Sequence, residues 1–310
     1  MILNTGDRTD IPAFYSEWFY NRIKEGFVLA RNPYYPDQVT RYALSADVID
    51  VLVFCTKNPK PMFEDFGLLS PFKTFWYVTI TPYGKETEPF VPEKEEVIDS
   101  LLKLSDLVGI KNVGWRYDPI FITEKYSLDF HIRAFEKIAV RLKEHVKHCV
   151  ISFIDLYSKT KRNFPEAGAV SSADQKSLTE ALGKIAEENG MKIHLCCENP
   201  ALAKGNVDAD GCLSKEILEE AIGARLNVPK RKPVREGCSC LLGSDIGAYN
   251  TCGHGCRYCY ANYDRKSVLS NMRRHNKFSP FLIGESREGD KVKAAKQASW
   301  RNDQKSIFDL

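Results

Sequence analysis

Three cysteines near the C-terminal end are the residues of this sequence best suited to chemistry. Cys252, Cys256 and Cys259 lie in one short run that also contains Gly253 and Gly255. Three thiolates at this spacing fit three irons of a cubane iron–sulfur cluster, and the glycines allow the loop to wrap around it. The fourth iron would then have no protein ligand. Such an iron is open to reaction, whereas a cluster with four cysteine ligands mainly serves structure or electron transfer.

Other chemistry is compatible with the same thiols. A zinc ion could use them with His254 or His275 as the fourth ligand, although zinc sites favour paired Cys-x2-Cys units and only one such unit is present. Cys256 and Cys259 alone match the spacing of a thioredoxin-type redox pair, but such a pair normally opens a helix after an early strand. Covalent haem attachment is excluded, because Tyr260 stands where a histidine is required.

Further cysteines could form a second metal centre. They are Cys196, Cys197, Cys212, Cys238 and Cys240. Either of the first two, with the other three, would supply the four ligands of a second iron–sulfur cluster, which would relay electrons, or anchor a substrate if one ligand were absent. A zinc ion that holds the C-terminal segment to the rest of the chain is the alternative, because spacing does not separate the two metals. Cys55 and Cys149 lie in apolar runs and are expected in the core.

The composition indicates a globular protein in a reducing compartment. The chain has 310 residues, of which 43% are apolar, and its 44 basic and 41 acidic side chains give a formal charge of +3. This length allows a sizeable core, and the charge is too balanced to indicate nucleic-acid binding by itself. The sequence shows no signal peptide and no apolar run of the roughly 18 residues that a membrane span needs, so we expect a cytoplasmic protein without membrane attachment. In the reducing cytoplasm, ten cysteines are more typical of metal or redox sites than of disulfides.

Alternating strands and helices would position these thiols. Short β-branched runs predict strands at residues 1–5, 27–31, 48–56, 74–81, 112–116, 149–155 and 192–198. Helical spacing of apolar residues predicts amphipathic helices within 97–108, 135–146 and 178–186, and Ser172 with Gln175 forms a capping box that opens the last of these. Repeated strand–helix units favour an α/β fold, a closed or partial (β/α) barrel of the TIM-barrel type, over an open doubly wound sheet.

Polar side chains follow most of the expected strands. The carboxyl ends of parallel strands meet at one mouth of a barrel, so we expect this mouth to be lined by Lys57, Asn58, Arg116, Asp118 and Asp155. Any one of them could instead belong to an ordinary turn. The barrel domain is expected over residues 1–228, and a cysteine-rich C-terminal segment over residues 229–310. A basic linker at 229–233 would join the two, and a surface arm would begin near residue 285.

Basic and aromatic residues are mixed after the cysteine run. The cations are Arg265, Lys266, Arg273, Arg274, His275 and Lys277, and the nearby aromatic residues are Tyr260, Tyr263 and Phe278. Nucleic-acid grooves use this mixture, but so does an ordinary solvated surface. Nucleic acid is therefore only one possible partner.

The spacing Cys-x3-Cys-x2-Cys, with Tyr258 before its last cysteine, resembles the cluster motif of radical SAM enzymes. The strand-end segments at residues 8–12, 56–59 and 116–119 are similar to an uncharacterised bacterial branch of that superfamily with the motif at its C-terminal end. They are more distantly similar to spore photoproduct lyase-like proteins. The resemblance covers residues 1 to about 285. The motif departs in position, because most radical SAM enzymes carry it after the first barrel strand.

The resemblance implies an oxygen-sensitive enzyme, an oxidoreductase or lyase, with a [4Fe–4S] cluster on Cys252, Cys256 and Cys259. S-adenosylmethionine (SAM) would bind the open iron. An electron from a donor such as flavodoxin or ferredoxin would cleave SAM to a 5′-deoxyadenosyl radical, which would attack an unknown substrate.

Residue type and place suggest which side chains hold SAM. Lys57 or Arg116 could pair with its carboxylate, Asp118 or Asp155 with its amine or ribose, and Asn58 with its adenine edge. The alternative function is a zinc-stabilised nucleic-acid-binding protein on a silent barrel, and a third is an electron-transfer protein with closed clusters.

Overall fold

The computed structural model describes residues 1–230 and 237–302, so residues 231–233 of the expected basic linker lie outside the described residues. A sheet of eight parallel strands forms the centre of the fold, in the order β11-β1-β4-β5-β6-β7-β8-β9. Its strands are β1 (Ile2–Asn4), β4 (Val51–Thr56), β5 (Thr74–Thr79), β6 (Val113–Ile120), β7 (His148–Phe153), β8 (Lys192–Leu195), β9 (Val207–Asp208) and β11 (Ser244–Asp245).

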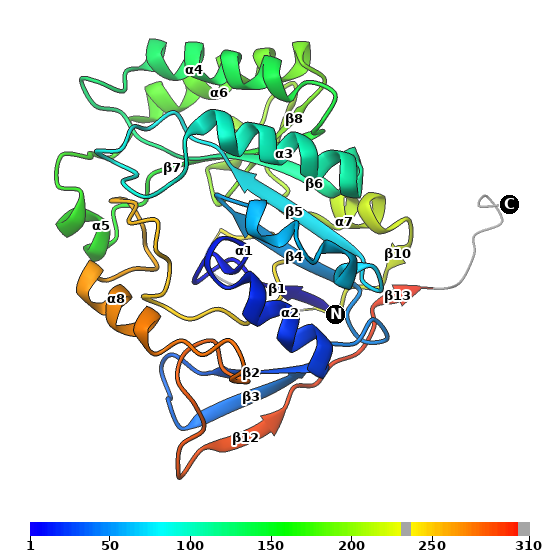
Figure 1. Cartoon of the computed structure of the whole chain (residues 1–310). Helices are drawn as coiled ribbons and strands as arrows, with labels where there is room; N and C mark the ends of the chain where they lie inside the picture. The colour runs from blue at the N-terminus through cyan, green and yellow to red at the C-terminus, as the bar shows by residue number, and fades with distance from the viewer. Residues whose placement is uncertain (231–236, 303–310) are drawn as a thin grey trace, which may run out of the picture.

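Helices connect these strands (Figure 1). They are α1 (Ile11–Phe14), α2 (Ser16–Glu25), α3 (Lys94–Val108), α4 (Leu128–Leu142), α5 (Ser158–Asn163), α6 (Ser172–Glu188), α7 (Lys215–Ile222) and α8 (Arg265–Arg273). Short 3-10 turns are η1 (Lys60–Met62), η2 (Phe66–Leu69), η3 (Ile110–Asn112) and η4 (Pro200–Leu202). Within the described part of the chain, no helix has the length and apolar character that crossing a bilayer requires.

The predicted α/β fold with a large parallel sheet is confirmed. From β1 through β4, β5, β6 and β7 to β8, the strands lie side by side in chain order. A (β/α) barrel has this order, whereas the order reverses at the middle of a doubly wound sheet. The architecture is therefore compatible with a barrel-like fold.

One predicted strand lies outside this sheet. β2 (Phe27–Arg31) pairs antiparallel with β3 (Gln38–Ala43), and β12 (Lys291–Ala294) lies parallel to β3 on its other side. The prediction of a parallel strand–helix unit at residues 27–31 is therefore wrong. The connection between β2 and β3 contains Pro33 and Pro36 and is too short for the crossover that parallel strands need, so it forms a hairpin instead.

Helix α6 begins one residue earlier than its sequence pattern predicts. The capping residue is Ser171, whose extended backbone precedes the helix and whose hydroxyl accepts a hydrogen bond from Asp174 N at 3.1 Å. Ser172 is already helical, so the predicted capping box of Ser172 and Gln175 is wrong. Gln175 instead donates its side-chain amide to the Val170 carbonyl at 3.3 Å.

Side chains alternate between the two faces of the central sheet. Leu52, Phe54 and Trp76 belong to the large core, together with apolar side chains of α2, α3, α4 and α6. Val51 and Phe75 directly precede Leu52 and Trp76 in the chain, but they belong to a second core with α7 and several cysteines. Successive strand residues point to opposite faces, so the long helices cover one face while α7 and the cysteines cover the other. Figure 1 shows α3, α4 and α6 along the same side of the sheet.

The C-terminal segment contributes a strand to each sheet of the described structure. β11 extends the central sheet beside β1, β12 joins β3, and β13 (Arg301–Asn302) pairs antiparallel with β10 (Arg225–Leu226). Near β13, the Asp50 carboxylate accepts hydrogen bonds from Ser299 Oγ at 2.5 Å and from Trp300 N at 2.7 Å. These contacts hold the end of the segment against the rest of the fold.

His131 on α4 should make the stability of the fold depend on pH. Its ring is fully buried, with Nδ1 2.9 Å from the Tyr117 hydroxyl and Nε2 2.9 Å from the Phe121 carbonyl oxygen. Burial lowers the pKa of His131, so below the ordinary histidine pKa of about 6.5 the unfolded chain binds a proton more readily than the folded protein. We expect the free energy of unfolding to fall as the pH drops from about 7 to about 5, and His131→Gln to reduce this fall.

Urea unfolding across that pH range measures the effect. His145→Gln is the matched control, because His145 is partly exposed, at 33% of its side chain. The explanation fails if wild type and His131→Gln lose stability equally as the pH falls.

Candidate active site at the cysteine-lined mouth

A C-terminal loop brings its cysteines to the carboxyl ends of β1 and β4. These cysteines, called the triplet below, are Cys252, Cys256 and Cys259. The His254 ring in this loop lies 2.9 Å from the carboxylate of Asp10, which follows β1. The same Asp10 oxygen accepts a hydrogen bond at 2.8 Å from the backbone N–H of Lys57, which follows β4. Gly255 has a φ of +70°, a left-handed conformation that lets the loop turn between two of its cysteines.

The three thiols of the triplet lie close to one another and are partly exposed. Burial raises the pKa of Cys252, and Asp10, Cys259 and Cys256 raise it further. Burial also raises the pKa of Cys256 to about 12, although the Lys57 ammonium opposes this effect. Without a bound cation the triplet is therefore a set of protonated thiols, and a metal centre would convert them to thiolates.

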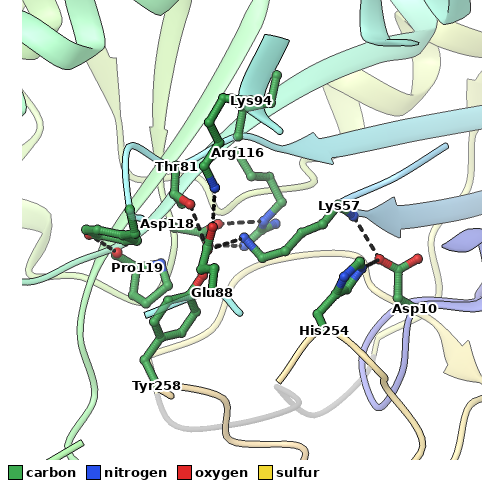
Figure 2. A network of polar contacts seen from close by, with 12 residues as sticks. Asp10, Lys57, Thr81, Glu88, Lys94, Arg116, Asp118, Pro119, His254 and Tyr258 are labelled. Carbon is green, nitrogen blue, oxygen red and sulfur yellow. Dashed lines mark hydrogen bonds and ion pairs between the residues drawn. The ribbon is translucent and has the colours of Figure 1, made fainter. Parts of the chain in front are cut away.

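Glu88 lies at the centre of a buried network beside the triplet (Figure 2). Its carboxylate accepts hydrogen bonds from Lys57 Nζ at 2.8 Å and Thr81 Oγ1 at 2.7 Å, and others from Lys94 Nζ and the Tyr258 hydroxyl. Burial of the fully enclosed side chain raises the pKa of Glu88, but the two ammonium groups outweigh it and lower this pKa to about 2. One carboxylate with two ammonium groups leaves a net positive charge.

That positive charge faces the triplet. Burial lowers the pKa of Lys57, but Glu88 and the thiol of Cys256 raise it above its ordinary value. The Lys57 ammonium therefore stays charged and lies close to Cys256. An opposite charge at this position favours the anionic form of the cysteine, or an anionic ligand bound beside it.

The structure brings three of the predicted SAM-binding residues together. Arg116 pairs with Asp118 through Nη2 at 2.6 Å and through Nε at 3.2 Å, and both side chains remain partly exposed. The Asp118 carboxylate lies close enough to Lys57 to raise the pKa of that lysine. Figure 2 shows Lys57, Arg116 and Asp118 around Glu88.

The other two predicted SAM-binding residues lie in turns. Asn58 uses its side-chain oxygen to accept a hydrogen bond from Lys60 N at 3.2 Å. Asp155 lies on the exposed loop after β7, where the Tyr157 hydroxyl donates to its carboxylate at 3.2 Å. SAM binding by any of the five residues stays a prediction.

A second set of cysteines meets on the face of the sheet that α7 covers. This five-cysteine group comprises Cys196, Cys197, Cys212, Cys238 and Cys240. Its side chains interact in a continuous series, Cys197 with Cys238, Cys238 with Cys240, and Cys212 with both Cys240 and Cys196. The Sγ atoms of Cys238 and Cys240 are 2.8 Å apart. The hydrogen bond from Cys212 outweighs burial and, with that from Cys238, lowers the pKa of Cys240 to about 6.

The structure thus gathers all the cysteines that the sequence predicts for a second centre. It holds them as free cysteines in mutual contact. Among residues 1–230 and 237–302, no group of three or more His, Cys, Asp or Glu side chains already has the spacing of the ligands of one metal ion. A metal would therefore have to displace thiol protons and shift the sulfur atoms at either cysteine group.

Asp7 lies between the two cysteine groups. Its carbonyl oxygen accepts a hydrogen bond at 2.5 Å from the hydroxyl of Tyr260, which follows the triplet, and its carboxylate lies near Cys240. Burial and the neighbouring Asp245 raise the pKa of Asp7 to about 7. Asp245 itself pairs with Arg8 at 2.5 Å. The mouth therefore contains a carboxyl group that can gain or lose a proton near neutral pH.

Sequence reasoning missed Glu88, Asp7 and Asp245. Asp7 had a detectable signal, because it follows the first expected strand. Glu88 lies within the connection between β5 and α3 and owes its burial to partners from elsewhere in the chain, so no local pattern marks it. Asp245 lies on β11, whose two residues are too few to show a strand period.

Some of the basic side chains that follow the triplet contact other residues of the same chain. The Arg265 guanidinium on α8 stacks on the Phe90 ring, 3.9 Å from its centroid, and Lys277 pairs with Glu17 at 2.5 Å. Nucleic-acid binding stays a prediction.

Replacing the central carboxylate should destabilise the protein strongly. Glu88→Gln removes the charge that compensates the ammonium groups of Lys57 and Lys94. Breaking a buried ion pair by removing one partner typically costs about 3–5 kcal/mol, and the 29% exposure of Lys94 places this site at the lower end. Chemical denaturation of the purified variant measures the loss.

Glu86→Gln is the matched control for Glu88→Gln. Glu86 pairs with Lys125, but its side chain is 49% exposed and that of Lys125 is 62% exposed, so the change in stability should be small. Similar small losses in both variants would show that the Glu88 network does not hold the loop.

Comparison with known proteins identifies a family for the chain. No curated protein and no solved structure matches it. A family model described as "Domain of unknown function (DUF1848)" matches residues 2–261. The matched region includes every strand of the central sheet and both cysteine groups. The chain therefore belongs to the DUF1848 family.

Proposed function

We propose that the protein is a radical SAM enzyme whose triplet holds a [4Fe–4S] cluster with one open iron. The observation that carries this proposal is the position of the triplet. Its loop contacts Asp10 after β1 and Glu88 after β5, in a sheet whose strands follow chain order. In α/β folds of this order, active sites lie at the carboxyl ends of the strands. A partial (β/α) barrel is the finer architecture that we propose for this sheet.

The residues around the triplet fit such a cluster. The three thiols are partly exposed, so an iron ligated there can meet a second molecule. The net positive charge of the Glu88 network offsets the negative charge of a thiolate-ligated cluster. Next to Asp10, the hydroxyl of Thr9 is buried and has no hydrogen-bond partner in the described part of the chain, so a bound ligand can supply one.

The chemistry of the bound group is that of radical SAM enzymes: once reduced, the cluster supplies the electron that cleaves SAM to a 5′-deoxyadenosyl radical. The side chains at the mouth bind and orient SAM and the substrate. Arg116 has several N–H donors, of which Asp118 uses those on Nε and Nη2, so the guanidinium can hold a carboxylate while it stays paired. Asp7, with its pKa near 7, can hold a proton toward a substrate. Reduction by a cytoplasmic flavodoxin or ferredoxin is part of the proposal.

Formation of 5′-deoxyadenosine tests the proposal. The protein is purified without oxygen, reconstituted with iron and sulfide, and mixed with SAM and dithionite. We expect wild type to form 5′-deoxyadenosine and Cys256→Ala to lose this activity, because the cluster loses one of its ligands. Cys149→Ala is the matched control, since Cys149 is a buried core cysteine outside both groups, and it should retain the activity.

Two outcomes contradict the proposal. One is a reconstituted wild-type protein without an iron–sulfur absorption spectrum. The other is equal formation of 5′-deoxyadenosine by Cys256→Ala and wild type. Zinc without iron in protein purified anaerobically would favour the zinc-stabilised nucleic-acid-binding protein, and salt-dependent binding to oligonucleotides would then support that function.

A further inference from the structure

The five-cysteine group joins the two ends of the central sheet. The strand order runs from β11 at one end to β9 at the other, and β8 lies beside β9. Cys196 directly follows β8, whereas Cys240 comes four residues before β11. The thiol of Cys212 interacts with both of these thiols and so connects them. Cysteine side chains therefore connect two segments that belong to opposite ends of the strand order.

The backbone around these cysteines allows a very close approach. Leu241 N, just after Cys240, donates to the Leu213 carbonyl at 2.8 Å. Gly211 has a φ of +92°, and a Cβ at this position would lie only 2.8 Å from Cys240 N. Position 211 therefore requires glycine, both because of its backbone conformation and because a side chain would collide with Cys240. The loop after β9 and the segment before β11 are pressed together where the thiols meet.

Four of the five cysteines form a buried set. The exposed fraction is 1% for Cys212, 6% for Cys240 and 9% for both Cys196 and Cys238. Cys197 is more exposed, and its φ of +58° is uncommon for a residue other than glycine. Four thiolates are the ligand set of a structural zinc ion and of a closed cubane cluster.

A cation lies near three of the four buried thiols, those of Cys196, Cys212 and Cys240. Burial lowers the pKa of Arg116, but Asp118 and the thiols of Cys212 and Cys196 raise it well above its ordinary value, so the guanidinium lies close to them. Four thiolates around a divalent ion leave a net negative charge. Burial of that charge is costly unless a partner offsets it, and Arg116 is placed to do so.

We propose that Cys196, Cys212, Cys238 and Cys240 bind a thiophilic metal centre, a zinc ion or an iron–sulfur cluster, that clips the two ends of the sheet together. The metal replaces the thiol protons, which pass to solvent, and no cysteine is oxidised. Cys197, the more exposed member of the group, is not part of the proposed ligand set. The clip is independent of the proposed SAM chemistry, because the triplet shares none of its ligands.

Metal content in a Cys256→Ser background tests the clip separately from the triplet. Protein purified anaerobically should hold about one zinc per chain, or about four iron with an equal amount of sulfide. Zinc without sulfide identifies a single ion and iron with sulfide identifies a cluster, and either supports the clip. Adding Cys212→Ser or Cys238→Ser should remove most of this metal. Adding Cys197→Ser should leave it, and so should Cys149→Ser at a buried cysteine outside the group.

Hydrogen exchange gives a second readout that does not depend on variants that fold poorly. Removing the metal from the same background protein with a chelator should increase amide exchange at the end of β8 and at β11 together, and refilling with Co²⁺ should produce thiolate-to-cobalt absorption. The proposal is overturned if the metal content is unaffected by both Cys212→Ser and Cys238→Ser. It is also overturned if the background protein holds no metal and its mass shows a disulfide between Cys238 and Cys240.

Discussion

A buried carboxylate with two ammonium partners determines where the candidate active site lies. Glu88 comes from the connection between β5 and α3, Lys57 follows β4, Lys94 begins α3, and Tyr258 belongs to the triplet loop. An unpaired carboxylate or ammonium at this depth would cost on the order of several kcal/mol, so each charge needs the others. Three separate parts of the chain, at Lys57, at residues 88–94 and at Tyr258, are thereby fixed at one point, and the triplet lies beside Lys57 because of it.

The C-terminal segment supplies cysteines to both cysteine groups. Its first part brings Cys238 and Cys240 to the face of the sheet that α7 covers and then forms β11. Its second part returns over the ends of β1 and β4 as the triplet loop. Arg116 lies near one set and its partner Asp118 lies near Lys57 at the other.

The sequence predicts those features whose signal is local. The apolar runs at β4 and β7 indicate strands covered on both faces, and cysteine spacing alone marks the triplet. Features that depend on distant partners were missed. β2 has the composition of any strand, and only its short connection to β3 makes it part of a hairpin. β11 is a strand because β1 offers it an edge, and Glu88 is buried because Lys57 arrives from another strand. Ser171 and Ser172 differ in backbone conformation, which composition does not encode.

The central claim is that the triplet holds a cluster with an iron open to SAM. The most direct measurement is the EPR spectrum of the anaerobically reconstituted and reduced protein, recorded before and after SAM is added. A molecule that binds the open iron alters the electronic environment of the cluster. The account predicts a cluster signal that changes on addition of SAM, and the part of the signal that responds to SAM should be absent from Cys256→Ala. A signal that SAM leaves unchanged would contradict it and would indicate closed clusters that only transfer electrons.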